Sequence, residues 1–158
     1  MDKLAWCKKQ KNGIELIEQN QNLSQEYIEK AENALMAVKS LEGNKEWQIS
    51  SAYYAMYFSL YAILMKLGIK CEIHACTIEI MKKILAKYFS TEEINLLQKS
   101  LTARIDAQYY TDRDVKEEQR INMIENAPKF HLKCKEIIIR FTSKETDAIR
   151  RVITKDEW

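Results

Sequence analysis

The sequence predicts an all-α protein, an up-and-down four-helix-type bundle of about five main helices with short terminal extensions. Three observations lead to this fold class. The 158 residues include only three glycines and one proline, which leaves little material for hairpin turns. Hydrophobic residues make up 46% of the chain and charged residues 30%, a mixture typical of amphipathic helices. Apolar residues also recur every three or four positions through most of the chain, and its length suits a single domain over residues 1–158.

The first expected helices follow one another closely. A short leading helix is expected over residues 3–18. The first core helix is expected to begin near Ser24, which we interpret as its N-cap, and to end at Gly43. The second is expected between Asn44 and Gly68. Its faces are nearly all apolar or small, so we predict that it is the central helix of the bundle.

Two further helices are expected in the middle of the chain. A stripe of apolar residues predicts a third helix from about His74 to Tyr88. Ser90 and Glu93 have the spacing of a capping box, in which the two side chains bond the backbone at a helix start. They predict a fourth helix that runs toward Arg104.

The last main helix is expected to begin at a second capping box, formed by Asp114 and Glu117, and to reach Phe141. Pro128 should kink or interrupt it, because proline lacks the backbone N–H group that a helix needs. The core bundle is therefore expected over about residues 22–141. The charged ending, residues 142–158, is expected to be a weak helix or a tail.

Charge and cysteine content limit the classes of function. The 25 basic and 23 acidic residues give a formal net charge of +2, so the chain lacks a global positive field and any contact with RNA must be local. No apolar stretch reaches the length of a membrane span and the start does not resemble a signal peptide, so we expect a cytoplasmic protein with no membrane contact. Four cysteines at irregular spacing (Cys7, Cys71, Cys76, Cys134) are expected to be reduced thiols.

The most distinctive stretch of the chain runs from Ser50 to Ala62, where tyrosines and small residues replace the usual aliphatic side chains. Small residues let neighbouring helices approach closely, and buried tyrosine hydroxyls require hydrogen-bond partners. Tyr53, Tyr54 and Tyr57 therefore suit either a packed interface or a polar site. Aromatic residues at helical spacing more often pack in a core or an interface, and we favour that interpretation.

This stretch and a second one carry a resemblance to a known family. The motifs are Ser51-Ala52-Tyr53-Tyr54-Ala55-Met56-Tyr57-Phe58, then Gly68 and His74, and then Arg104-Ile105-Asp106-Ala107-Gln108-Tyr109-Tyr110. In this pattern, which covers about Ser24 to Phe141, the chain resembles the HEPN domain, in its small stand-alone prokaryotic branch. The resemblance implies a helical bundle, a homodimer, no cofactor, and a possible partnership with a minimal nucleotidyltransferase. It also implies either a metal-independent ribonuclease toxin or a member that does not cleave RNA.

The ribonuclease motif of that family is an Arg followed after about four to six residues by a His. In this chain the Arg is Arg104, and the positions open to the His hold Tyr109, Tyr110 and Thr111. The missing His matters because cleavage at a 2′-hydroxyl needs a proton acceptor that titrates near neutrality. His74 and His131 are the only histidines, and both are remote from Arg104 in the sequence.

The same residues also have purely structural interpretations. Arg104 could be a helix-end cation that pairs with Asp106 or Asp112. His74, at a helix start, could simply bond a backbone carbonyl or a neighbouring tyrosine, and His131 is expected in the core. The cysteines and histidines could be combined into a zinc site on paper, but their spacing differs from the usual zinc motifs, and we predict no metal.

Two functions therefore stay open. In the first, the chain is the HEPN partner of a nucleotidyltransferase in a toxin–antitoxin-like pair, and it binds a nucleotide, RNA or protein as a helical dimer. The binding residues predicted for this function are Tyr53, Tyr54, Tyr57, His74, Asp106 and Tyr110. In the second, it is a metal-independent endoribonuclease whose catalytic residues are Arg104 and Tyr109.

Overall fold

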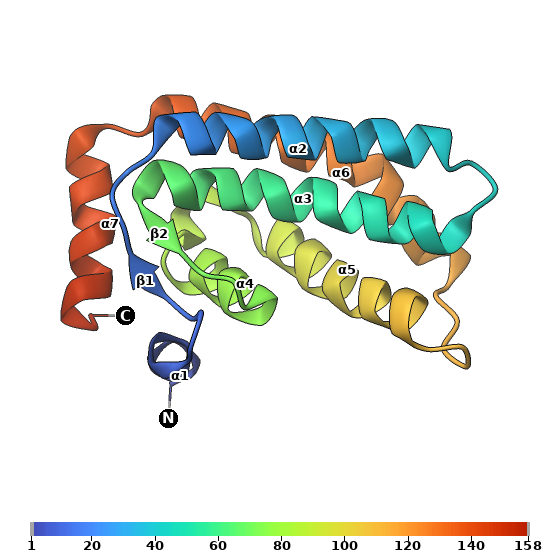
Figure 1. Ribbon diagram of the computed structural model, residues 1–158, viewed down its shortest axis with the longest axis horizontal. Helices are drawn as coiled ribbons and strands as arrows, with labels where there is room; N and C mark the ends of the chain where they lie inside the picture. The colour runs from blue at the N-terminus through green and yellow to red at the C-terminus, as the bar shows by residue number, and fades with distance from the viewer. Residues whose placement is uncertain (1, 158) are drawn as a thin grey trace.

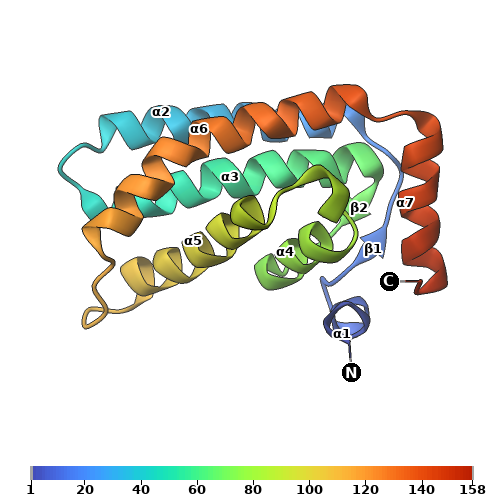
Figure 2. The ribbon, with the colours of Figure 1, turned by 180° about the vertical axis from the view of Figure 1, so that it is seen from behind.

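The computed structural model describes residues 2–157, and it confirms the all-α fold class. In chain order the elements are α1 (Lys3–Lys9), β1 (Glu15–Leu16), α2 (Gln21–Ser40), α3 (Lys45–Leu67), β2 (Ile69–Lys70), α4 (His74–Lys83), the 3-10 turn η1 (Ala86–Tyr88), α5 (Thr91–Tyr109), α6 (Glu117–Arg140) and α7 (Ser143–Lys155). Helices α2, α3, α5 and α6 extend along the long axis, and α7 crosses one end of them (Figures 1 and 2).

Helix α3 is the central helix, as its composition predicts. It packs against α2, α5 and α6, and most of its side chains are buried. Ala52, Ala55 and Ala62 are fully buried, and their small side chains let the neighbouring backbones approach. The helix begins after Asn44, whose side chain accepts a hydrogen bond from the backbone N–H of Trp47, and it ends at Gly68 in the left-handed region (φ +69°). Both ends agree with the sequence prediction.

The start of α2 differs from the prediction. Its N-cap is Asn20, whose side chain accepts a hydrogen bond from the Leu23 N–H over 2.9 Å, so the helix begins before Ser24. Ser24 lies within the helix and is buried, and its hydroxyl donates to the Ala62 carbonyl of α3 over 2.7 Å. The serine thus connects two helices instead of capping one.

The expected leading helix over residues 3–18 is also wrong beyond Lys9. The chain turns at Gly13, where a Cβ atom would lie 1.8 Å from the Cys7 carbonyl oxygen. It then forms β1, which pairs antiparallel with β2, Glu15 opposite Lys70 and Leu16 opposite Ile69. The backbone groups here find their partners far along the chain, which helical periodicity cannot reveal.

The third expected helix is shorter than predicted. Helix α4 ends at Lys83, and the N–H groups of Ile84 and Leu85 both donate to the Ile80 carbonyl. This turn buries Leu85, and η1 replaces the last expected turn.

Of the two predicted capping boxes, at the starts of α5 and α6, only the first is present. The capping box of Ser90 and Glu93 is present and starts α5 as predicted. The second predicted box is wrong, because α6 begins after Lys116 with no side-chain cap, and Glu117 is its first residue. Pro128 does not interrupt α6, which continues to Arg140 with the proline exposed to solvent.

The ending forms a docked helix. Thr142 and Glu145 make a capping box at the start of α7, and Ile149 and Ile153 are buried against the bundle. Arg150 donates from Nη1 to three backbone carbonyls, those of Ile17 (2.9 Å), Leu67 (2.8 Å) and Gly68 (2.9 Å). These bonds fix α7 on the end of α3, so residues 143–155 are not a loose tail.

One expectation about the cysteines is wrong. Cys7 and Cys76 form a disulfide, with their Cα atoms 5.7 Å apart, whereas Cys71 and Cys134 are free and buried. Helix α1 packs on α4 and brings together two residues that are 69 positions apart in the sequence. In the described part of the chain, none of the helices combines the length and apolar character required to cross a membrane.

Candidate functional site

Arg104 lies inside the bundle, where α5 faces α3. It is only 7% exposed, and its guanidinium carbon lies 5.2 Å from the ring centre of Tyr53, 5.5 Å from that of Tyr54 and 5.8 Å from that of Tyr109. Its Nη1 donates to the side-chain oxygen of Gln108 over 3.3 Å, one helical turn away. The buried Nε has no hydrogen-bond partner among residues 2–157.

The helix-end interpretation of Arg104 is therefore wrong. Helix α5 continues to Tyr109, so Arg104 lies more than one turn before its end. Within the described residues it forms no ion pair, and Asp106 pairs instead with Arg113 at 3.1 Å. The positive charge of Arg104 faces aromatic rings and an amide, which compensate a buried cation only in part.

His74 joins the same cluster from the start of α4. Its ring stacks on Tyr57 with the ring centres 4.1 Å apart, and its Nδ1 lies 2.7 Å from the Tyr53 hydroxyl. Burial, and to a lesser extent the nearby charge of Arg104, lower the pKa of His74 to about 4. His74 is therefore neutral at pH 7. In the tautomer protonated at Nε2, the Tyr53 hydroxyl donates to Nδ1.

The tyrosines of α3 differ in their roles. Tyr53 and Tyr57 are buried, as the preferred core interpretation predicts, and burial raises the pKa of each hydroxyl far above its usual range. Both hydroxyls therefore stay protonated at pH 7. Tyr54 is only partly buried and stacks on Phe58.

Two of the predicted site residues lie in a different cluster. The ring of Tyr110 packs under the guanidinium of Arg113 at 3.6 Å, and the same guanidinium pairs with Asp106. Tyr109, in contrast, contacts Arg104 and is 65% exposed. The fold thus unites Arg104, Tyr53, Tyr54, Tyr57, His74 and Tyr109, and it places Asp106 and Tyr110 around Arg113.

Two cavities adjoin the Arg104 cluster between the start of α3 and the end of α5. The first has a volume of about 260 Å³ and is lined by Glu46, Trp47, Ser50, Ala107, Gln108 and Tyr109. The second, of about 240 Å³, is lined by Ala34, Trp47, Ser50, Ser51, Tyr54, Phe58 and Gln108. Trp47 and Gln108 line both, and the sequence analysis missed these two residues. The sequence could have indicated Gln108, because residues four positions apart on a helix lie side by side and Gln108 follows Arg104 at this spacing.

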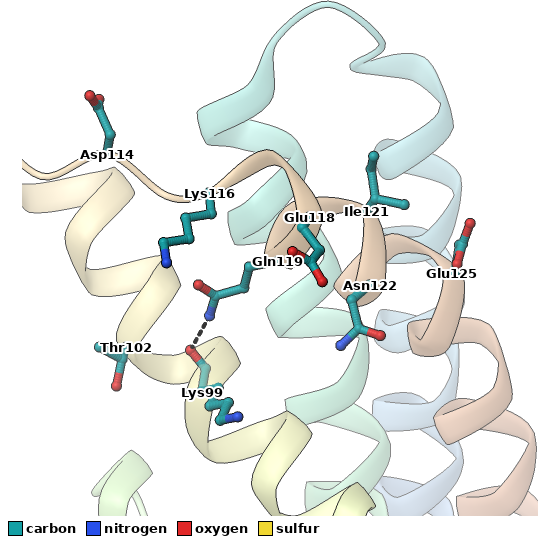
Figure 3. A pocket seen from close by; sticks show the side chains of 9 residues that line it. All are labelled: Lys99, Thr102, Asp114, Lys116, Glu118, Gln119, Ile121, Asn122 and Glu125. Carbon is teal, nitrogen blue, oxygen red and sulfur yellow. Dashed lines mark hydrogen bonds between the residues drawn. The ribbon is translucent and has the colours of Figure 1, made fainter.

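A larger cavity lies elsewhere. Its volume is about 970 Å³, and it opens between α5 and the first turns of α6, where Gln119 donates to the Lys99 carbonyl over 3.2 Å (Figure 3). Its lining mixes Lys99 and Lys116 with acidic residues and contains none of the predicted site residues. We place the candidate site at Arg104, because charge, burial and aromatic rings coincide there.

The second histidine belongs to the core. His131 is buried, its Nδ1 lies 2.8 Å from the Ser59 hydroxyl, and its Nε2 lies 3.3 Å from Glu32. Burial lowers the pKa of His131, and Glu32 opposes this shift. Cys76 is engaged in the disulfide, and residues 2–157 contain no group of three or more His, Cys, Asp or Glu side chains arranged to hold a metal ion.

Comparison with known proteins identifies one relationship. The family model of the HEPN domain matches residues 24–137, which extend from α2 into the last turn of α6. The matched segment therefore contains all the residues of the Arg104 cluster. None of the curated proteins matches the chain.

Proposed function

Because the chain belongs to the HEPN domain family, a family of nucleotide-binding and ribonuclease-type domains, we propose that it binds a phosphate group of a nucleotide or single-stranded RNA at Arg104. In this proposal the protein is a binding module. It acts as a homodimer and as the partner of a minimal nucleotidyltransferase, two properties that rest on family membership.

The observation that carries this proposal is the uncompensated charge of Arg104. A buried cation without an anionic partner is costly, because its desolvation is not repaid. A phosphate oxygen would supply the missing partner through a charge-assisted hydrogen bond. Gln108 lines both neighbouring cavities and makes a single 3.3 Å contact with Nη1, so a ligand that displaced this amide from either cavity would reach the guanidinium.

The electrostatics of the site favour binding over cleavage. A general base for a 2′-hydroxyl works best when its pKa lies near the working pH. The pKa of His74 is about 4, so the ring is neutral but weakly basic, and the buried Tyr53 hydroxyl holds its proton even more firmly than an exposed one. The cluster therefore has a cation for phosphate and lacks a well-tuned proton acceptor.

One contact favours a second candidate function, a metal-independent ribonuclease. His74 reaches the Arg104 cluster within a single chain, through its 2.7 Å contact with Tyr53. In such a reaction His74 would accept the proton of the 2′-hydroxyl while that oxygen attacks the phosphorus that Arg104 holds. The 5′-oxygen would take a proton from water as it leaves, His74 would return its proton to the resulting hydroxide, and a 2′,3′-cyclic phosphate would remain.

A binding assay tests the proposal. Fluorescence anisotropy with a short labelled single-stranded RNA, in a chelator and a phosphate-free buffer, should show binding that falls about tenfold or more in the Arg104→Met variant, the loss of one charge-assisted contact. Arg113→Met is the matched control, since Arg113 is an exposed cation near the same helix end and should change affinity less than about threefold. Equal binding by wild type and Arg104→Met would refute the proposal.

A cleavage assay separates the two candidates. End-labelled RNA is incubated with each protein in the presence of the chelator and examined on a sequencing gel. Cuts that vanish in both Arg104→Met and His74→Gln would establish the ribonuclease. Binding without cuts would support the binding module.

A further inference from the structure

We infer that the cavity of about 260 Å³ beside Arg104 is a nucleobase subsite, in which an unpaired base stacks on the indole of Trp47. The inference rests on the proposed function and adds to it a binding site for the base of the nucleotide whose phosphate binds Arg104. Ala107, Gln108 and Tyr109 on one side of the cavity belong to the motif that the family resemblance identifies, whereas Glu46, Trp47 and Ser50 on the other side do not.

Exposed aromatic rings are the first observation. Trp47, in the first turn of α3, is 54% exposed, and Tyr109, the last residue of α5, is 65% exposed. Both line the same cavity, although large aromatic side chains usually bury most of their surface. Free aromatic rings beside a cavity are the usual platform for unpaired bases, because every base has a π-face that can stack.

The polar lining of the cavity is the second observation. Glu46 offers a carboxylate acceptor, Ser50 a hydroxyl, and Gln108 an amide with both donor and acceptor atoms. These groups match the edges of a base, which present amino donors and ring or carbonyl acceptors. Glu46 is the one charged residue that lines either of the two cavities, and its negative charge disfavours a phosphate there. The neutral base belongs in the cavity and the phosphate at Arg104.

Gln108 connects the two parts of this site. It lines the cavity and also accepts the hydrogen bond from Arg104, so the base and the phosphate would lie on opposite sides of one side chain. Arg104 and the α5 residues of the cavity lie on adjacent turns of that helix, while Trp47 comes from the first turn of α3, and a single nucleotide can span adjacent helical turns.

The experiment compares two ligands of equal charge. One is a short single-stranded RNA labelled at its 3′ end through a spacer, and the other is an abasic oligonucleotide with the same label and the same number of phosphates. Trp47→Leu should weaken binding of the RNA by about tenfold, the loss expected for one stacked base, and should change binding of the abasic ligand by less than about twofold. Arg104→Met should weaken both.

Trp6→Leu is the matched control, since Trp6 is also an exposed tryptophan, 45% exposed, but lies on α1. It should leave both affinities unchanged. Tryptophan fluorescence provides a second measurement, because the RNA should quench wild type and Trp6→Leu more strongly than Trp47→Leu. Far-ultraviolet circular dichroism and urea unfolding check that each variant is folded.

The outcomes are distinguishable. If wild type binds neither ligand, the proposed function fails and this inference fails with it. If Trp47→Leu binds the RNA as wild type does, the inference is overturned while phosphate binding at Arg104 stands. If Trp47→Leu loses both ligands together with a halving of the molar mass in light scattering, Trp47 contacts a second copy of the chain, and the base subsite is again refuted.

Discussion

Replacement of Arg104 by Met should stabilise the free protein while it weakens phosphate binding by about tenfold or more. Methionine has a similar length and no charge, so its side chain can stay buried against the same rings of Tyr53 and Tyr54. This opposition between stability and function follows directly from an unpaired buried cation. A purely structural arginine would give the reverse sign for stability.

The size of the effect follows from the contacts of Arg104. The unsatisfied Nε costs about 1–3 kcal/mol, and the desolvated charge costs several kcal/mol more. The three ring contacts stabilise the folded state by about 0.5–1 kcal/mol each, and the hydrogen bond to Gln108 stabilises it by about 1 kcal/mol. We therefore expect the free energy of unfolding of Arg104→Met to exceed that of wild type by about 1–4 kcal/mol.

Arg150 is the matched control within the same chain. Its Nη1 donates to three backbone carbonyls, so Arg150→Met would remove this donor from Ile17, Leu67 and Gly68, of which Gly68 would keep the bond from the Ile17 N–H. We expect the free energy of unfolding of Arg150→Met to be about 2–4 kcal/mol lower than that of wild type.

The assay is urea unfolding followed by circular dichroism at pH 7 in a phosphate-free buffer, with midpoint and slope compared among the three proteins. A loss of more than about 1 kcal/mol in Arg104→Met at an unchanged slope would refute the reasoning, because it would show that the surroundings of Arg104 already compensate its charge. Addition of a bound ligand should reverse the order, since only wild type would gain stability from it.

Three further predictions concern the fold and its pH dependence. Gly68→Ala should lower the free energy of unfolding in urea by about 2–4 kcal/mol, because φ is +69° and a Cβ would lie 2.5 Å from a carbonyl oxygen. Gly43→Ala, with φ +88° and no atom within 4 Å of the Cβ, should lower it by only about 1 kcal/mol. Equal losses of stability in the two variants would contradict this account. Thiol titration of the unfolded, unreduced protein should find two of the four cysteines reactive, because Cys7 and Cys76 are joined, and four reactive thiols would contradict the pairing. The pKa of His74 is lowered from 6.5 to about 4, so between these pH values the folded state binds fewer protons than the unfolded state, and the free energy of unfolding falls as the pH drops. His74→Gln should remove about 1 kcal/mol of this fall after allowance for solvent screening. Superimposable profiles of stability against pH for wild type and His74→Gln would count against the lowered pKa.

The sequence by itself determined those features whose causes lie within a few residues. The capping box of Ser90 and Glu93 starts α5, and Asn44 and Gly68 bound α3, because caps and stops act on the nearest backbone groups. The central position of α3 was also predictable, since a helix that is apolar or small on nearly every face must be buried. The family motif likewise directed attention to Arg104.

Only the tertiary structure decided features that depend on two segments meeting. Ser24 resembles an N-cap in the sequence but donates a hydrogen bond to α3. Cys7 forms a disulfide with Cys76, and β1 pairs with β2. The contact of His74 with Tyr53 is the most consequential of these, because it brings a neutral imidazole to the ring over which the buried guanidinium of Arg104 lies. Local rules act over one helical turn, whereas these contacts arise from how helices pack, which depends on the shapes of whole elements.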